Sequence, residues 1–213
     1  MKCSFVGMGI PRIRKTGMVK GNRWEDHYAR RARDEKWLAR SVYKLQEIDK
    51  KFKLIRRGDH ILDLGCYPGS WSQYGIKMVG PAGDVVGVDL HTPERVVSSN
   101  FRFIRADILK LDPDWLSREI GVRDVVLSDL APQTSGIKMV DTARSLELLE
   151  KAFHIALRVL KRQGHFLGKV FEGEDLNDLK RVFSEHFDPV RLIRPSAVRK
   201  GSREVYLLGW NFS

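Results

Sequence analysis

The chain has 213 residues, of which 42% are hydrophobic and 31% charged, a composition typical of one ordinary globular domain. No stretch approaches the roughly 20 apolar residues of a membrane span, and the N-terminus lacks the pattern of a signal peptide. The two cysteines, Cys3 and Cys66, argue against a disulfide framework and favour a reducing, cytoplasmic location.

The net charge of +11 is concentrated at one end of the chain. Residues 1–57 hold 17 Lys and Arg against 6 Asp and Glu, a net charge of +11, whereas the remaining residues hold 21 of each kind. Trp24, Tyr28 and Trp37 are interleaved with these cations. Cations and aromatic rings together favour contact with the phosphates and bases of a nucleic acid, although a solvated basic arm would have the same composition.

In chain order, residues 1–22 are rich in Gly, Lys and Arg, so we expect a flexible basic arm there, followed by a single domain over 23–213. Apolar residues then recur every three or four positions from Trp24 to about Phe52, which predicts a helix. Short β-type runs and helical segments alternate after it. Strands are predicted at 60–64, 84–90, 101–106, 124–130, 164–171, 189–195 and 204–210, and helices at 70–79, 141–162 and 174–186.

This alternation predicts an α/β fold of the Rossmann-like type, with a mostly parallel seven-stranded sheet and helices on both faces. Only about eight residues separate the last two predicted strands, which is too few for a parallel crossover. The last strand is therefore expected to run antiparallel to its neighbours.

Residues 63–73, DLGCYPGSWSQ, form a glycine-rich loop directly behind a short apolar strand. Open α/β sheets bind ligands at the carboxyl ends of their strands, where this loop lies. Gly65 and Gly69 allow a tight turn and a close approach to a ligand. Because the spacing is not G-x-G-x-x-G and Pro68 interrupts the loop, a pyrophosphate cofactor such as NAD is disfavoured.

Three carboxylates mark the ends of the next three predicted strands, since the second ends in Asp89, the third is followed by Asp107 and the fourth ends in Asp129. Converging acids suit a ligand that carries positive charge, and S-adenosylmethionine, with its sulfonium and ammonium groups, fits this description. One carboxylate after the second strand can hold ribose hydroxyls, and another can accept from an adenine amino group. The alternative is that these aspartates merely cap the helices that follow.

Proton chemistry is suggested by charged residues in apolar surroundings. Lys169 lies inside the apolar strand FLGKVF, and burial favours the neutral form of a lysine, which can act as a base. Lys44 on the first helix, Asp129 and Glu204 at the start of the last strand could meet it at the strand ends. For Lys44, the alternative is a stem that reaches the surface and leaves its ammonium in water.

Six segments, in this order and at these spacings, resemble the FtsJ/RrmJ-type ribosomal RNA 2′-O-ribose methyltransferases, the RlmE family: RSVYKL, DLGCYPGSWSQ, GVDL, SDLAPQTSG, GKVFEGE and SREVYLL. The resemblance runs from about residue 24 to residue 210. It implies a catalytic tetrad at Lys44, Asp129, Lys169 and Glu204. It also implies binding of S-adenosylmethionine at Gly69, Trp71, Asp89, Asp107 and Asp129.

Three positions depart from the family pattern. Ser70 stands where the family has a second glycine, Gln133 where it has Asn, and Val198 where it has Ser before an arginine. No tetrad or acidic cofactor position is lost, so these changes bear on contacts with the substrate.

The activity implied by the resemblance is methyl transfer from S-adenosylmethionine to a ribose 2′-hydroxyl, with Lys169 as the base, on a uridine of 23S rRNA in the large ribosomal subunit. A tRNA ribose methyltransferase would share the same residues, and a non-catalytic RNA-binding assembly protein could keep the fold. We expect a monomer that binds RNA through its basic N-terminal region and first helix. The histidines show no metal-ligand spacing, so no metal is expected.

Overall fold

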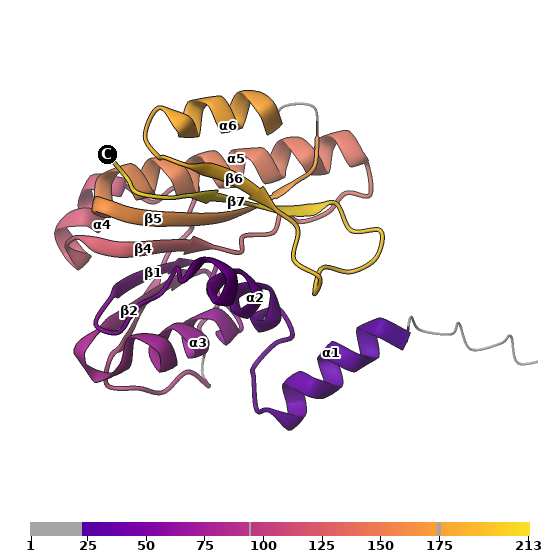
Figure 1. Ribbon diagram of the computed structural model, residues 1–213, viewed down its shortest axis with the longest axis horizontal. Coiled ribbons are helices and arrows are strands. Elements are labelled where there is room, and N and C mark those ends of the chain that lie inside the picture. The colour runs from indigo at the N-terminus through magenta and orange to yellow at the C-terminus, as the bar shows by residue number, and fades with distance from the viewer. Residues whose placement is uncertain (1–22, 94, 174–175) are drawn as a thin grey trace, which may run out of the picture.

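The computed structural model describes residues 23–93, 95–173 and 176–213 (Figure 1). The predicted basic arm over 1–22 lies outside these residues. At the centre is one seven-stranded sheet, in the order β3-β2-β1-β4-β5-β7-β6. Its strands are β1 (His60–Leu64), β2 (Asp84–Asp89), β3 (Phe101–Arg105), β4 (Arg123–Ser128), β5 (Leu160–Phe171), β6 (Val190–Ile193) and β7 (Glu204–Gly209).

Strand directions confirm the predicted topology. β1 pairs in parallel with β2 and β4, β2 with β3, and β4 with β5. β7 runs antiparallel to both β5 and β6, between which it lies. The strand order reverses between β1 and β4, and ligands of open α/β sheets bind at the carboxyl ends of the strands at such a switch point.

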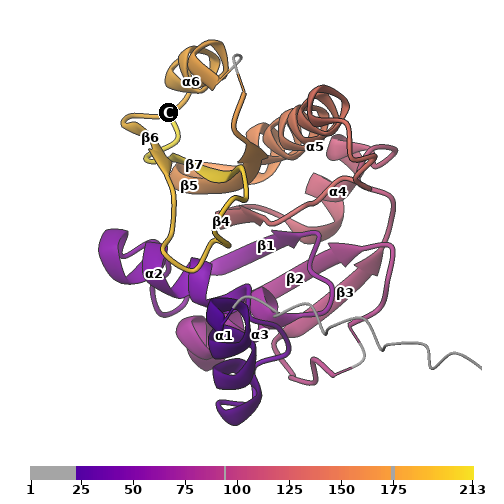
Figure 2. The same cartoon turned by 90° about the vertical axis from the view of Figure 1, so that its right-hand side faces the viewer.

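Helices cover both faces of the sheet, as Figures 1 and 2 show. The helices are α1 (Arg23–Asp34), α2 (Val42–Phe52), α3 (Ser70–Val79), α4 (Pro113–Ile120), α5 (Lys138–Val159) and α6 (Leu176–Ser184), with a short 3₁₀ turn at Gly80–Ala82. One hydrophobic core joins the sheet to α1, α2 and α3, and a second joins it to α4, α5 and α6. Alternate strand residues supply the two cores, with Ile61 in one and Leu62 and Leu64 in the other.

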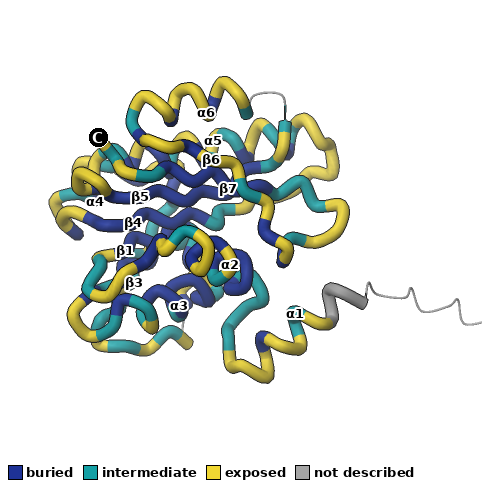
Figure 3. The backbone as a smooth tube through the Cα atoms, in the orientation of Figure 1, coloured by how far each residue is buried: buried dark blue, intermediate teal, exposed yellow. Residues whose placement is uncertain are grey.

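The central strands β1, β2, β4, β5 and β7 are largely buried between these layers, and Figure 3 shows them mostly dark blue, whereas the edge strands β3 and β6 are partly exposed. Every residue of β4 is buried, and burial on both faces explains why its central residues, Val125, Val126 and Leu127, are apolar without alternation. Within the described residues, no helix is long and apolar enough to cross a membrane.

The helix predicted from Trp24 to Phe52 is in fact two helices, α1 and α2, separated by residues 35–41. Lys36 adopts a left-handed backbone conformation with φ of 61°, which an α-helix cannot continue through. Glu35 stabilises the turn, because its carboxylate accepts from the Trp37 indole at 3.0 Å and from the Tyr43 hydroxyl at 3.1 Å. The apolar spacing continues across the turn because both helices pack on the same core.

Other boundaries shift by a few residues. α5 begins and ends three residues before the predicted 141–162, and β5 begins at Leu160, four residues before the predicted start. α4 was not predicted, although Asp112 followed by Pro113 is a helix-start signal. The Asp112 carboxylate indeed caps this helix by accepting from the Asp114 backbone N–H at 2.9 Å.

Candidate active site

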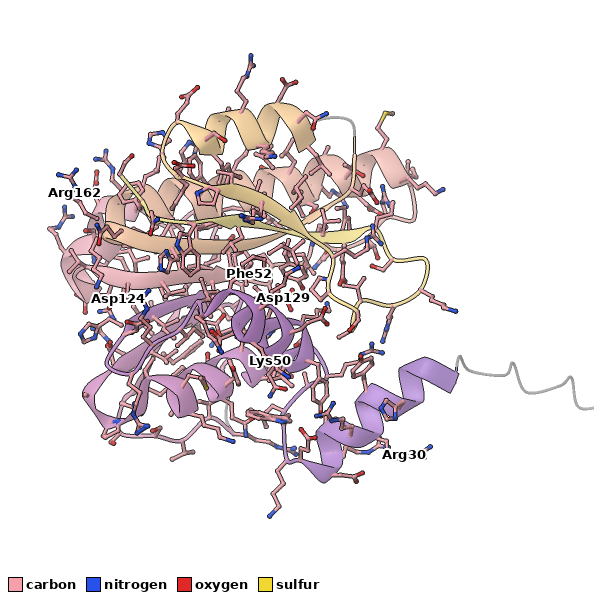
Figure 4. All side chains as sticks on the ribbon, viewed as in Figure 1. Arg30, Lys50, Phe52, Asp124, Asp129 and Arg162 are labelled. Carbon is pink, nitrogen blue, oxygen red and sulfur yellow. The ribbon has the colours of Figure 1, made fainter. Side chains whose placement is uncertain are left out.

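The four side chains of the predicted tetrad come together at the carboxyl-terminal edge of the sheet. The Lys44 Nζ lies 2.5 Å from the Glu204 Oε2. The Lys169 Nζ lies 3.1 Å from the Asp129 Oδ1 and donates to the Asp129 backbone carbonyl at 2.7 Å. Figure 4 shows Asp129 beside α2, where that helix meets the sheet.

Strand pairing explains this convergence. Lys169 in β5 pairs directly with Tyr206 in β7, two residues after Glu204. Asp129 follows the last residue of β4, the parallel neighbour of β5. Lys44 comes from α2, which packs on the face of the sheet that carries Tyr206. Residues far apart in the chain therefore meet because they share one edge and one face of the sheet.

Tyr206 links the two ion pairs and was not predicted as a site residue. Its hydroxyl donates to Asp129 Oδ1 at 2.8 Å, and its ring centroid lies 5.8 Å from the Lys44 Nζ. The ring is fully buried, and burial raises the pKa of its hydroxyl well above the ordinary value. The sequence signal was its place two residues after Glu204, since alternate residues of a strand share a face.

Asp129 is the electrostatic centre of this group. Burial raises the pKa of its carboxyl, but the positive charges of Lys169 and Lys44 outweigh burial, and the pKa lies below its ordinary value. Asp129 is therefore an anion at neutral pH. Both lysines are largely shielded from water, with 5% of Lys169 and 9% of Lys44 exposed. Two lysines and two acids thus meet in a largely buried cluster.

A cleft of about 640 Å³ opens beside this cluster. It is lined by the loops that follow β1, β2, β3 and β4, and by the first turns of α5. Four predicted cofactor residues lie in its wall: Gly65, Asp89, Asp107 and Asp129. Three carboxylates facing one cleft suit a ligand with cationic groups, and the apolar Leu90, Ile108 and Leu130 beside them suit a flat ring. The residues present therefore fit S-adenosylmethionine.

Two of these carboxylates also fix the loops that carry them. Asp89 accepts backbone N–H bonds from Tyr67 at 3.0 Å and from His91 at 2.9 Å, so it joins the loop after β1 to the loop after β2. Asp107 accepts from the backbone of Leu109 at 3.1 Å. These contacts lie within loops, whereas the N-caps of α4 and α5 are Asp112 and Ile137, so the helix-capping alternative does not describe Asp89 or Asp107. Each of their carboxylate oxygens can still take a further hydrogen bond.

Gly69 and Trp71, the other predicted cofactor residues, stand beside the cleft and are not in its lining. A Cβ at Gly69 would clash with a methyl group of Val96, so this glycine lets the loop after β1 pack on Pro93 and Val96. The Trp71 indole donates to the Ser41 carbonyl at 2.9 Å, and its ring lies 5.8 Å from that of Tyr206. Trp71 therefore packs against Tyr206 and holds it in place beside the tetrad.

Three α5 residues in the cleft wall were not predicted: Arg144, Glu147 and Leu148. The Arg144 guanidinium donates to the Gln133 carbonyl at 3.0 Å and so holds the loop after β4. The sequence did not indicate that these α5 residues line a cleft, because polar residues on an amphipathic helix normally face water. Cys66, in the loop after β1, is buried, and burial raises the pKa of its thiol far above the ordinary value, so it is no nucleophile.

Several known proteins resemble this chain over most of its length. A family model described as FtsJ-like methyltransferase matches residues 37–212. A protein of Bdellovibrio bacteriovorus called Ribosomal RNA large subunit methyltransferase E is 46% identical over 187 residues, which cover 86% of this chain and 95% of the relative. A protein of the same name from Desulfosudis oleivorans is 42% identical and covers 92% of this chain and 95% of the relative.

Solved structures show the same likeness. A crystal structure from Plasmodium falciparum, assigned as a ribosomal RNA methyltransferase, is 30% identical in sequence and superposes with a TM-score of 0.73. The match covers 83% of this chain and 98% of that one.

Proposed function

Because this chain belongs to the FtsJ-like methyltransferase family, we propose that it transfers a methyl group from S-adenosylmethionine to a ribose 2′-hydroxyl of RNA. The substrate is a uridine of 23S rRNA in the large ribosomal subunit, which the names of the relatives at 46% and 42% identity support. The observation that carries the proposal is the contact among four tetrad side chains beside an acidic cleft.

Binding of the cofactor falls to the cleft residues. S-adenosylmethionine supplies a methyl carbon on a cationic sulfonium. Asp89 accepts from the ribose hydroxyls, Asp107 accepts from the adenine amino group, and the anionic Asp129 attracts the positive end. Gly65 allows close approach of the backbone, while Gly69 and Trp71 hold the surrounding loop and helix in place.

Lys169, after it has lost its own proton to water, is the base that takes the proton from the ribose hydroxyl. A hydroxyl is a weak nucleophile near neutral pH, so removing its proton as the methyl group transfers lowers the barrier. The two contacts of the Lys169 Nζ with Asp129 orient the amino group and leave a further tetrahedral position for the substrate. Holding the hydroxyl in line with the methyl carbon contributes as well, because positioning replaces a bimolecular encounter.

Lys44, Glu204 and Asp129 act as positioning residues for this step. The Lys44–Glu204 ion pair fixes the start of β7 against α2, and Tyr206 connects that pair to Asp129. The intact tetrad disfavours the non-catalytic RNA-binding alternative, because a protein that only binds RNA has no use for two buried, mutually balanced ion pairs at a cleft mouth.

RNA contact is expected from the basic N-terminal region and α1. Arg30, Arg31 and Arg33 are exposed on that helix, and the Lys77 ammonium lies 5.6 Å from the ring of Trp37 behind it. We further propose that residues 23–213 form a single methyltransferase domain, since both cores share one sheet, and that the protein acts as a monomer in the cytoplasm.

The test is a methyl-transfer assay with labelled S-adenosylmethionine on assembled large subunits, protein-free 23S rRNA and tRNA, followed by mapping of the 2′-O-methyl position. Labelling of a 23S ribose 2′-oxygen is expected. Labelling of tRNA alone would replace the substrate with tRNA. A protein that binds the cofactor but labels no RNA would contradict the proposal.

A further inference from the structure

A groove outside the active site runs between α2 and the edge strand β6. One hollow of about 490 Å³ lies between the two elements, and a second of about 330 Å³ continues it toward β7. The two hollows share Lys51, Phe52, Pro189 and Arg191, and we call them together the edge groove. Figure 4 shows Phe52 between the end of α2 and the β6–β7 pair.

The charge of the edge groove is strongly positive. Lys51, Lys180, Arg191 and Arg194 line it, against the single acid Glu47. Both Glu47 carboxylate oxygens accept from Ser196, at distances of 2.6 to 3.0 Å, so this acid is already engaged.

All four cations are exposed to water, and three of them have no ion-pair partner among the described residues. Arg194 pairs with Glu172 at 2.6 Å, whereas no carboxylate of the described residues forms an ion pair with Lys51, Lys180 or Arg191. Uncompensated cations along a groove attract a polyanion.

Aromatic side chains accompany these cations. Phe52 and Trp210 line the groove and are each half-buried, and the Trp210 ring is held by stacking on His165 at 3.7 Å. A basic groove with aromatic faces is the usual arrangement for binding single-stranded nucleic acid, because cations contact the backbone while rings stack on bases. An acidic protein segment would use the cations but would leave the rings without a role.

One end of the groove adjoins the tetrad. Glu47 at that end lies one helical turn after Lys44 on α2. Ile193, also in the lining, pairs across the sheet with Tyr206, whose hydroxyl binds Asp129. A strand with its target ribose at Lys169 can therefore continue directly along α2 and β6.

We propose that the edge groove binds the phosphate backbone of the RNA strand beyond the methylated nucleotide, an inference that rests on the proposed RNA substrate. The competing explanation is that Arg191 and Arg194 only keep an exposed edge strand from pairing with other chains. That role would require charge on β6 and would not involve Lys51 on α2.

The test compares Lys51→Gln/Arg191→Gln with a control, Arg118→Gln/Arg162→Gln, that removes the same charge elsewhere. Arg118 lies on α4, and Figure 4 shows Arg162 at the far end of the molecule from Asp129. Binding to a single-stranded oligouridylate and methyl transfer to protein-free 23S rRNA are both measured across a salt series. A second groove variant, Lys51→Gln/Lys180→Gln, leaves β6 unchanged in case the first folds poorly.

Each lost phosphate contact lowers the logarithmic salt slope by about 0.7, which corresponds to roughly fivefold weaker binding per cation at 0.1 M salt. Both groove variants should therefore bind the oligouridylate roughly 25-fold more weakly and raise KM for RNA by a similar factor. The kcat and the thermal shift caused by S-adenosylmethionine should stay at wild-type values, and the control should match the wild type throughout.

Equal RNA binding by the groove variants and the control would overturn this inference, and so would aggregation of the β6 variant with unchanged RNA affinity. The oligouridylate assay does not depend on catalysis. A wild-type protein that methylates no RNA would therefore refute the proposed function while the binding comparison still decides the role of the groove.

Discussion

At the residue scale, the proposed active site consists of charged side chains that hold one another in place. Lys44 contacts Glu204 and Lys169 contacts Asp129, while Tyr206 touches members of both pairs. The charged members could be predicted from the sequence because ionisable groups inside apolar segments are rarely buried without a partner. Tyr206 was not singled out, although its spacing from Glu204 was a signal, since an aromatic residue in a strand is ordinarily part of the core.

Because Lys44 and Glu204 act as a pair, replacing either side chain should lower kcat/KM about as much as replacing both. Lys44→Met and Glu204→Gln should each lower kcat/KM by about tenfold or more, which corresponds to at least 1.4 kcal/mol. The double variant should fall close to the poorer single variant. The same cycle on the exposed Arg102–Glu119 pair should leave the rate unchanged. If the double variant lost kcat/KM by the product of the two single losses, Lys44 and Glu204 would act independently.

Asp63, in the middle of β1, is a buried carboxyl that no sequence argument singled out. It is fully buried, and Ser72 donates to its Oδ2 at 2.6 Å. Burial raises its pKa from the ordinary 3.8 to about 7, and the nearby charges of Asp129 and Asp89 add to the increase. The folded state therefore binds a proton that the unfolded state has lost between pH 3.8 and 7.

Below pH 3.8 the Asp63 carboxyl is protonated in both states and costs nothing. As the pH rises to 7 the cost of keeping it buried grows to about 4 kcal/mol and then stays constant. Asp63→Asn should therefore be more stable than the wild type at pH 8 by up to that amount, and the advantage should vanish near pH 4. Denaturant unfolding at several pH values measures it, and a difference independent of pH would contradict it.

At the element scale, periodicity located the strands and the helix at 70–79 well, because burial on one or two faces leaves a regular pattern. It failed where a turn keeps the pattern, as at Lys36 between α1 and α2, and where a helix is short, as at α4. Local backbone conformation and capping decide those boundaries, and both depend on contacts between side chains that a pattern does not contain.

The loop between β1 and α3 packs tightly on the end of β4, and Gly65 makes this possible. A Cβ there would lie 2.6 Å from a Leu130 methyl group, and the residue has φ of 77°. Gly121 has φ of 71° but nothing within 4 Å of an added Cβ, so it is a matched control. Gly121→Ala should cost about 1 kcal/mol of folding free energy from backbone strain alone.

Gly65→Ala should lower the free energy of unfolding by about 1–3 kcal/mol more than Gly121→Ala does, because the added methyl group overpacks against Leu130. It should also weaken S-adenosylmethionine binding, because the wall of the cleft moves. Denaturant unfolding and the thermal shift by the cofactor report the two effects. Equal losses at the two glycines, with unchanged cofactor binding, would mean that the contact with Leu130 is not needed.

At the scale of the whole molecule, the order of the strands places the cleft and the tetrad residues at one edge of the sheet. Strands β2 and β3 are added on one side of β1, and β4 and the later strands on the other side. The cleft lies at the carboxyl ends of β1 and β4, where this order reverses. The antiparallel β7 then places Glu204 and Tyr206 at the same edge. The number of strands could be predicted from the apolar runs, and the antiparallel direction of the last one from the short connection before it. The edge groove could not, because it depends on which elements become neighbours in space.

Acid stability of the whole fold should depend on His165, stacked on Trp210 near the opposite end of the sheet. Burial lowers its pKa from 6.5 to about 4, so the unfolded chain takes up a proton in that window while the folded protein does not. The contribution of neutral His165 to the free energy of unfolding should be fully present above pH 6.5, and it should fall by about 3 kcal/mol as the pH drops to 4.

Asp63 changes stability in the opposite direction over the same window, so the wild type should show a shallow dependence. His165→Gln should remove the acid-side loss and leave a protein whose stability rises on acidification from pH 6.5 to 4. Thermal unfolding across that range checks this, and parallel curves for the variant and the wild type would refute it.

The most direct test of the catalytic assignment is single-turnover methyl transfer to 23S rRNA by Lys169→Met, with Lys161→Met at the other end of the same strand as the control. S-adenosylmethionine should still raise the melting temperature of both variants. The rate should fall by about 10²- to 10⁴-fold for Lys169→Met and stay at the wild-type value for the control. A folded, cofactor-bound Lys169→Met protein that transfers methyl groups at the wild-type rate would contradict the role given to this lysine.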